Sequence, residues 1–399
     1  MTAVMWWYPA AAMRPPDEPT AAFDSCPERR GTGSEKWDRW QGRDVLPMWV
    51  ADMDFRTADE VLAAIHARVD HGVFGYTNEP PGFRPALAAH LERRHGWQVD
   101  PAAIVGVPGV VTALALTARL LAARDEEILT FTPVYPPFLT LPGLAGRKSV
   151  RVPLLQGGGA WTIDWDAFES AARSPAAKIL WLCQPQNPTG TVWTRDDLLG
   201  IADIAERHGL AVVSDEIWAD LVLDEEHPHV PFASLDHPAA ARAITLVAPS
   251  KTWNLAGLSC AAAIVPDAAL RRRWRTAGAG LVPMVNPLGY AAAEAAWRHG
   301  DAWRRRLLDV LRRHRALVLE RIAAIPGLSC MPWQATYLAW IDCRATGVAD
   351  PQAACEAAGL GPSDGRDFGL PGFIRLNTGC PTDRLLLALD RLEAAFARR

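Results

Sequence analysis

Apolar residues recur along this chain with two different spacings. Residues 58–72 and 84–97 carry apolar positions three and four apart, which predicts two amphipathic helices. From about residue 104, short apolar runs alternate with helix-patterned stretches such as residues 196–209. These runs are EEILTF, AKILWL, LAVVSD, AITLVA and CAAAIV. Strands that alternate with helices predict an α/β domain with a mostly parallel sheet flanked by helices.

The pattern changes again near residue 290. A long helical stretch is followed by two strand-like runs, YLAWID (337–342) and GFIRLN (372–377), while QGGGA (156–160) predicts a turn. We therefore expect four parts. They are a poorly ordered segment over 1–22, an N-terminal arm over 23–57 that belongs to a smaller domain, a large domain over 58–290, and a small C-terminal α+β domain over 291–399.

Composition and charge exclude several classes of function. The 399 residues are 49% hydrophobic with a formal net charge of −4, so the chain builds a large core and has no general attraction for nucleic acids or anionic membranes. Pro108, Gly109 and Arg119 interrupt the apolar stretch 104–123, which predicts a strand, a turn and a core helix. The seven cysteines form no CxxC pair, and the first residues do not resemble a signal peptide. We expect a cytoplasmic protein without a metal, nucleic-acid or membrane partner.

Polar residues follow three of the predicted strands. AKILWL leads into a turn with Asn187, LAVVS leads into Asp215, and AITLVAP leads into Ser250 and Lys251. Because the carboxyl ends of parallel strands share one edge of a sheet, we expect Asn187, Asp215 and Lys251 to converge on one pocket. Singly, such an aspartate is more often a helix cap and such a lysine is usually exposed, but their matching context favours a site.

A lysine, a carboxylate and an amide in one pocket suit pyridoxal phosphate. The lysine forms a Schiff base with the aldehyde, the carboxylate keeps the pyridine nitrogen protonated, and the amide donates to the ring hydroxyl. The phosphate needs backbone N–H groups at a helix start, which PGVVTAL (108–114) supplies. Gly109, Val110 and Val111 are therefore candidate phosphate-binding residues, although the valines alone would equally be core residues. Ser250 adds a hydroxyl, and Tyr135 either stacks on the ring or simply packs its loop.

From about Arg30 to its end, the chain resembles the fold-type I pyridoxal-phosphate transferases, and within them the cystathionine β-lyase or C–S lyase branch of MalY/PatB type. The matching stretches are RGTGSEKW, LPMWVADMDF, GVFGYT, PGVVTAL, TPVYPPF, QNPTG, SDEI, PSKTWNLAGL, ATYLAWIDCR and GFIRLN. The resemblance implies a large domain with a mixed, mostly parallel, seven-stranded sheet, a smaller α+β domain, and a homodimer whose active sites are shared across the interface.

The resemblance also implies residue roles. Lys251 is the Schiff-base lysine and moves the substrate proton. Tyr76 reaches the phosphate of the neighbouring subunit, and Arg375 holds the substrate α-carboxylate, whose two oxygens fit a guanidinium fork. Considered alone, Tyr76 is equally a core tyrosine, and Arg375 is more often paired with a surface acid. The other implied cofactor residues are Val110, Val111, Tyr135, Asn187, Asp215, Trp218 and Ser250, and the other substrate residues are Tyr135 and Ala51.

At three places the sequence departs from the pattern of the C–S lyase branch, and these departures leave the identity of the substrate open. Trp218 stands where relatives commonly have histidine, and an indole can neither accept a hydrogen bond nor titrate. Gln184 and Gln186 flank a proline where Asn-Pro-His is usual, and Ala335 replaces a frequent glycine. Lys251, Asp215 and Asn187 stay matched to the branch, so the changes put the identity of the substrate in doubt and not the cofactor.

The expected reaction is α,β-elimination from L-cystathionine or another cysteine S-conjugate of amino-acid type, giving a thiol, pyruvate and ammonia. An aminotransferase would use the same residues and stays open. So does a biosynthetic enzyme that acts on an S-cysteinyl natural-product intermediate by C–S cleavage or by decarboxylation-coupled deamination. A regulator that binds pyridoxal phosphate without turnover is the non-enzymatic alternative.

Overall fold

The computed structural model describes residues 23–397, so the expectation of a poorly ordered segment over 1–22 lies outside the described residues. The helices are α1 (Glu35–Asp38), α2 (Asp59–Asp70), α3 (Phe83–His95), α4 (Val110–Leu121), α5 (Pro136–Leu144), α6 (Trp165–Ala172), α7 (Arg195–His208), α8 (Pro238–Ala241), α9 (Ala268–Gly278), α10 (Pro287–His299), α11 (Asp301–Ala323), α12 (Pro351–Ala357) and α13 (Thr382–Phe396). The strands are β1 (Leu46–Pro47), β2 (Ile104–Val107), β3 (Glu127–Thr132), β4 (Lys148–Gly157), β5 (Ala160–Ile163), β6 (Ala177–Cys183), β7 (Ala211–Asp215), β8 (Ile244–Val247), β9 (Ala261–Ile264), β10 (Ser329–Cys330), β11 (Leu338–Asp342), β12 (Leu360–Gly361), β13 (Ser363–Asp364) and β14 (Phe373–Asn377).

The main sheet has the strand order β2-β9-β8-β7-β6-β3-β4-β5. Neighbouring strands from β8 to β4 are parallel, whereas β9 and β5 are antiparallel to their neighbours. The predicted α/β class and mostly parallel sheet are therefore confirmed. The sheet has eight strands instead of seven, because the predicted turn at 156–160 closes a hairpin that adds β5. Gly158 and Gly159 allow this turn with φ of 59° and 80°.

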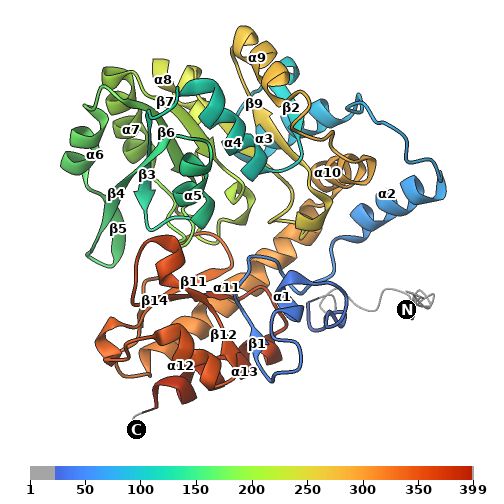
Figure 1. Ribbon diagram of the computed structural model, residues 1–399. Helices are drawn as coiled ribbons and strands as arrows, with labels where there is room; N and C mark the ends of the chain where they lie inside the picture. The colour runs from blue at the N-terminus through green and yellow to red at the C-terminus, as the bar shows by residue number, and fades with distance from the viewer. Residues whose placement is uncertain (1–22, 398–399) are drawn as a thin grey trace, which may run out of the picture.

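Strand side chains alternate between two apolar layers, one on each face of the sheet. Leu129 and Phe131 of β3 pack with residues of α6, α7 and α8, whereas Ile128, the residue before Leu129, packs with residues of α4, α5 and α9. This is the period of two that a strand imposes on its side chains. The two groups of helices cover opposite faces of the sheet and leave its strand ends open for a site (Figure 1).

The C-terminal part is built around a second, antiparallel sheet of order β10-β11-β14-β13. Its strands β11 and β14 are the predicted runs 337–342 and 372–377. Strand β1 of the N-terminal arm pairs with β12, so the arm lies against this part of the molecule (Figure 1). The expected domain limit at residue 290 falls within α10, which packs on α2 and α3. The four-part division stays a prediction.

A buried ion cluster fixes the arm. The Asp54 carboxylate is fully buried and accepts hydrogen bonds from Lys36 Nζ at 3.1 Å, Trp37 Nε1 at 2.8 Å and Arg384 Nη1 at 2.9 Å. Burial by itself would raise the pKa of Asp54, but Lys36, Trp37 and Arg384 together hold it below its usual value. The cluster therefore joins the arm to α13 near the C-terminus.

Other features of residues 23–397 concern membranes, metals and thiols. No helix in this range has both the length and the apolar character needed to cross a bilayer. Its histidine, cysteine and carboxylate side chains form no group that could hold a metal ion. All seven cysteines lie in the range and are free thiols.

Candidate active site

Three neighbouring parallel strands deliver the predicted polar residues to one edge of the main sheet. Asn187 lies in the turn after β6, Asp215 is the last residue of β7, and Lys251 follows β8. Asp215 lies opposite Cys183 of β6 and Leu246 of β8 in the strand register. The structure thus brings the three residues together where the sequence pattern places them.

The Lys251 amine faces this edge. Its Nζ donates to the backbone carbonyl of Ala51 at 2.7 Å and lies 5.7 Å from the ring centroid of Trp218. Loss of water lowers the pKa of Lys251 to about 8, and the positive charge of Arg375 acts in the same direction. Lys251 is therefore a desolvated amine, not a strand-end lysine that reaches into solvent.

The pKa of Asp215 is shifted in the opposite direction to that of Lys251. Its carboxyl is buried, and burial raises its pKa to about 7 although the Ile217 N–H, 3.2 Å from Oδ1, and the charge of Lys251 oppose this. A protonated ring nitrogen beside this carboxylate would stabilise its charged form. The carboxyl therefore fits the pyridine end of pyridoxal phosphate.

Arg375, on β14, is buried and joins the C-terminal sheet to the site. Its Nη1 donates to Asn187 Oδ1 at 3.0 Å, and its Nη2 donates to the Trp49 carbonyl at 2.8 Å and to Ser363 Oγ at 3.3 Å. Within residues 23–397 it forms no ion pair with a surface acid. Because Asn187 Oδ1 faces the guanidinium, its NH₂ group is the side that remains to donate to a ring hydroxyl.

The guanidinium of Arg375 has capacity for one more partner. Burial lowers its pKa to about 10, so it stays charged at neutral pH. Its Nε is buried and has no hydrogen-bond partner among residues 23–397. Buried polar atoms rarely stay unpaired in a folded protein. A bound carboxylate would satisfy this group, as the predicted role requires.

The start of α4 supplies the expected phosphate end. Strand β2 is antiparallel to β9, as β8 is, so β2 runs parallel to β8 and α4 begins at the same edge of the sheet. Gly109 precedes the helix with φ of 116°, and no side chain from the described part of the chain caps the helix start. Val110 is buried in the core, whereas Val111 is 39% exposed. Uncapped N–H groups at this helix start fit an anion.

Tyr135 lies between β3 and α5, beside the charged residues of the site. Burial raises its pKa, and the charges of Arg375 and Asp215 also act on it. Ser250 immediately precedes Lys251 after β8. Together with the amine, the carboxyl, the amide and the helix start, these residues fit pyridoxal phosphate.

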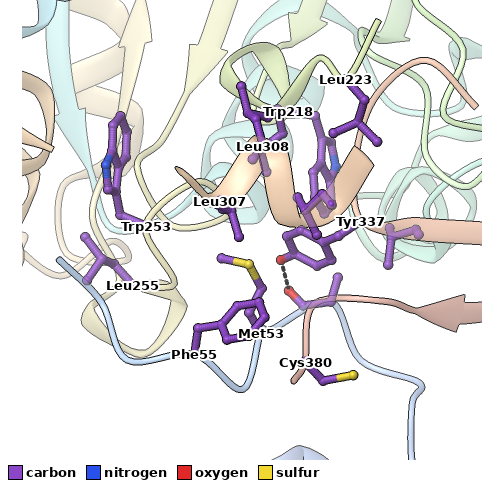
Figure 2. Packing of buried hydrophobic residues seen from close by; sticks show 14 of the residues in the cluster. Met53, Phe55, Trp218, Leu223, Trp253, Leu255, Leu307, Leu308, Tyr337 and Cys380 are labelled. Carbon is purple, nitrogen blue, oxygen red and sulfur yellow. Dashed lines mark hydrogen bonds between the residues drawn. The ribbon is translucent and has the colours of Figure 1, made fainter. Parts of the chain in front are cut away.

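Trp218 and Tyr337 form an apolar wall beside Lys251. Their rings meet edge to face with centroids 4.9 Å apart, and both are buried. The Tyr337 hydroxyl donates to the Ala51 carbonyl at 3.0 Å (Figure 2). Lys251 Nζ donates to the same oxygen. Tyr76, by contrast, is fully exposed in the single chain and is not a core residue.

Sequence reasoning missed several residues of the site. The carbonyl of Trp49 and the hydroxyl of Ser363 hold Arg375, and Tyr337 holds the Ala51 carbonyl. Tyr337 lies in a stretch that carries the family resemblance, but nothing in the pattern assigns it a role. Its neighbour Thr336 is buried with φ of 79°, a strained conformation for a β-branched residue that only the structure reveals.

Comparisons with known proteins agree with this geometry. The family described as aminotransferase class I and II matches residues 43–392. Cystathionine β-lyase PatB of Bacillus subtilis (strain 168) is 37% identical over 389 residues, which cover 94% of this chain and 100% of that protein. The crystal structure of OvoB matches with a TM-score of 0.92 and 42% identity, covering 94% of this chain and 99% of that one. The structure of cystalysin from Treponema denticola, which contains pyridoxal 5′-phosphate, matches with a TM-score of 0.89 and 30% identity, covering 94% and 98%. The chain belongs to the aminotransferase class I and II family.

Proposed function

We propose that the protein is a pyridoxal-phosphate-dependent carbon–sulfur β-lyase that converts L-cystathionine or another cysteine S-conjugate to a thiol, pyruvate and ammonia. The observation that carries the proposal is the placement of Lys251, Asp215 and Arg375 around one edge of the main sheet. Full-length similarity to a cystathionine β-lyase supports the lyase reaction.

Each end of the site would hold a different part of the cofactor. Asp215 would bind the protonated ring nitrogen, the Asn187 amide would donate to the ring hydroxyl, and the N–H groups after Gly109 would bind the phosphate. Tyr135 would lie against the ring. When bound, pyridoxal phosphate supplies an aldehyde for the substrate amine and a ring that accepts the electron pair of the α-carbon.

The chain itself orients the substrate and moves its proton. Arg375 grips both oxygens of the α-carboxylate, which fixes the orientation of the α-C–H bond. Lys251 takes the α-proton at Nζ, a task that suits an amine with a pKa of about 8. The Cβ–S bond then breaks and sulfur leaves with the bonding pair as a thiolate. Aminoacrylate remains and hydrolyses to pyruvate and ammonia.

Two further proposals concern assembly and location. A homodimer is supported by exposed apolar side chains next to Tyr76, with Val73 61% and Phe74 56% exposed in the single chain. Burial of that surface against a second copy would place Tyr76 where the family resemblance puts it, at the neighbouring active site. Seven free thiols support a reducing cytoplasm.

Product analysis tests the reaction. The purified protein reconstituted with pyridoxal phosphate should release pyruvate and thiol in equal amounts from a cysteine S-conjugate, without a keto-acid acceptor. Lys251→Ala should abolish this release and the absorbance of the attached cofactor, whereas Lys148→Ala, at an exposed lysine of β4, should leave both unchanged. Stoichiometric amination of the cofactor in a single turnover, without thiol release, would instead identify an aminotransferase.

A further inference from the structure

A groove of about 420 Å³ adjoins the candidate active site. It is lined by Gly33, Ser34, Glu35, Asp38, Arg39 and Trp49. Trp49 connects the groove to the site, because its backbone carbonyl accepts a hydrogen bond from Arg375 at 2.8 Å. Trp49 therefore belongs both to the groove and to the groups that hold Arg375, and none of the predicted site residues lines the groove.

The charge of Glu35 influences the pKa values of two side chains of the candidate site, Lys251 and Tyr135. Burial lowers the pKa of Lys251, and the Glu35 carboxylate is among the acids that oppose this shift. Burial raises the pKa of Tyr135, and Glu35 adds to that shift. Glu35 is thus among the acids whose charge acts on both side chains.

Glu35, the first residue of α1, and Arg39, the residue that caps its C-terminal end, lie four positions apart, a spacing at which acidic and basic side chains commonly pair. Among the described residues, the ion pairs of this segment involve Arg30, Lys36 and Arg43 instead. The Arg39 guanidinium lies over the rings of Trp49 and Trp40, 4.3 Å and 4.9 Å from their centroids. The groove thus presents one carboxylate and one guanidinium without an ion-pair partner in residues 23–397.

Asp38, the second acid that lines the groove, already has hydrogen-bond partners, and α1 is held in place. Asp38 accepts hydrogen bonds from Gly31 N at 2.7 Å and Gly33 N at 2.9 Å, so it closes its own loop. Lys36 and Trp37 anchor the helix from below through the buried Asp54. Glu35 and Arg39 are therefore presented by a rigid element at a defined separation, about 5–6 Å between Cβ atoms.

We propose that Glu35 and Arg39 bind the far end of the substrate when that end is itself an α-amino acid group, with Glu35 at its ammonium and Arg39 at its carboxylate. The two side chains carry opposite charges one turn apart, as the two charged groups of such an end require. This inference rests on the proposed β-lyase function. It narrows the substrates to conjugates whose departing thiol carries both charges, such as L-cystathionine or L-cystine, in preference to S-alkyl cysteines.

Substrate selectivity of the holoenzyme tests this proposal. Glu35→Gln and Arg39→Gln should each lower kcat/KM for L-cystathionine about 3- to 10-fold, the effect of one solvent-accessible charged contact. Both should leave kcat/KM for S-ethyl-L-cysteine within about twofold, because its ethyl group reaches neither charge. Glu60→Gln and Arg43→Gln are matched controls, since they change the same charges at exposed positions outside the groove and should alter neither value.

Binding measured without turnover separates recognition from chemistry. The Lys251→Ala variant is reconstituted with pyridoxal phosphate, and Glu35→Gln is added to it. Calorimetry should then show that Glu35→Gln weakens the binding of L-cystathionine by the same 3- to 10-fold factor and leaves the binding of S-ethyl-L-cysteine unchanged. An equal loss of binding affinity for both ligands, or no loss for either ligand, overturns the proposal. If the wild-type enzyme cleaves S-ethyl-L-cysteine but the variants show no selectivity, the β-lyase function stands and this inference fails. If the wild-type enzyme cleaves neither conjugate, the β-lyase function itself fails.

Discussion

At the scale of single residues, burial decides the chemistry of the candidate site. Loss of water moves the pKa of Lys251 down to about 8 and that of Asp215 up to about 7. In both groups burial favours the neutral form, because the charged form loses its hydration. The sequence names the two side chains, but it does not show how much water each one loses.

The lowered pKa of Lys251 predicts how fast the apoprotein takes up pyridoxal phosphate at different pH. Only the neutral amine attacks the aldehyde, so the attachment rate should rise about tenfold per pH unit below pH 8 and level off above it. Stopped-flow absorbance between pH 6 and about 10 measures this rate. A rate that keeps rising beyond pH 9, as for an ordinary lysine, would contradict the shift.

Asp215→Asn tests the proposed ring contact. The amide keeps the size of the side chain and can still accept from Ile217 N–H, but it carries no charge to hold a protonated ring nitrogen. We expect bound cofactor with kcat lowered about 10²- to 10³-fold. Absorbance titration and steady-state kinetics measure the two effects, and unchanged kcat would remove Asp215 from its proposed role.

At the scale of secondary structure elements, the apolar pattern predicted most of the fold, and local caps set the ends. The stretch 196–209 is α7, which begins after a capping box at Thr194 and ends at Gly209 with φ of 69°. The stretch 84–97 is α3, which ends at Gly96 with φ of 63°. No predicted run covers β4 or β5, which lie at one edge of the sheet and mix exposed with buried residues, so neither forms the continuous apolar run that marks the central strands.

Gly109→Ala tests the start of α4. An alanine there would meet no atom within 4 Å, but φ of 116° is strained for any residue with a Cβ. We expect about 1–3 kcal/mol lower stability and at least tenfold weaker binding of pyridoxal phosphate. Denaturation and cofactor titration measure these effects. Gly143→Ala in α5, which also meets no atom but lacks a positive φ, should not weaken cofactor binding.

At the scale of the whole molecule, contacts between the two ends of the chain complete the site. The arm supplies Ala51 and Trp49, the C-terminal part supplies Arg375 on β14 and Tyr337 just before β11, and the segment after β8 supplies Lys251. The buried cluster around Asp54 holds the arm in this position. Stability of the cluster and geometry of the site are therefore coupled.

Asp54→Asn should destabilise the folded chain by about 3–5 kcal/mol, because it leaves Lys36 and Arg384 around an uncharged partner. The pKa of Asp54 is lower in the folded protein than in the unfolded chain. The stability that the charged carboxylate contributes is therefore fully present above the pKa of the unfolded state, and it is lost as the pH falls through the pKa of the folded state. Denaturant unfolding at several pH values measures both. Asp59→Asn, in an exposed ion pair with Arg56, should change stability by less than about 0.5 kcal/mol.

Phe74→Asp tests the proposed homodimer. A charge placed in a buried apolar interface should separate the subunits, so sedimentation should show monomers. Because Tyr76 would then leave the neighbouring site, affinity for pyridoxal phosphate should fall as well. Leu144→Asp changes another exposed apolar residue, 78% exposed on α5, and should leave the assembly intact. A dimer that persists in Phe74→Asp would place the interface elsewhere.

The sequence by itself determined the α/β class, the family, and the residues that follow β6, β7 and β8. It could do so because apolar periodicity and the chemistry of Asn187, Asp215 and Lys251 are properties of local sequence. Only the tertiary structure decided what surrounds Lys251 and Arg375. Their partners include the backbone carbonyls of Ala51 and Trp49, which lie about half the chain or more away. Every residue has such a carbonyl, so its contacts depend on the fold and leave no mark in the sequence.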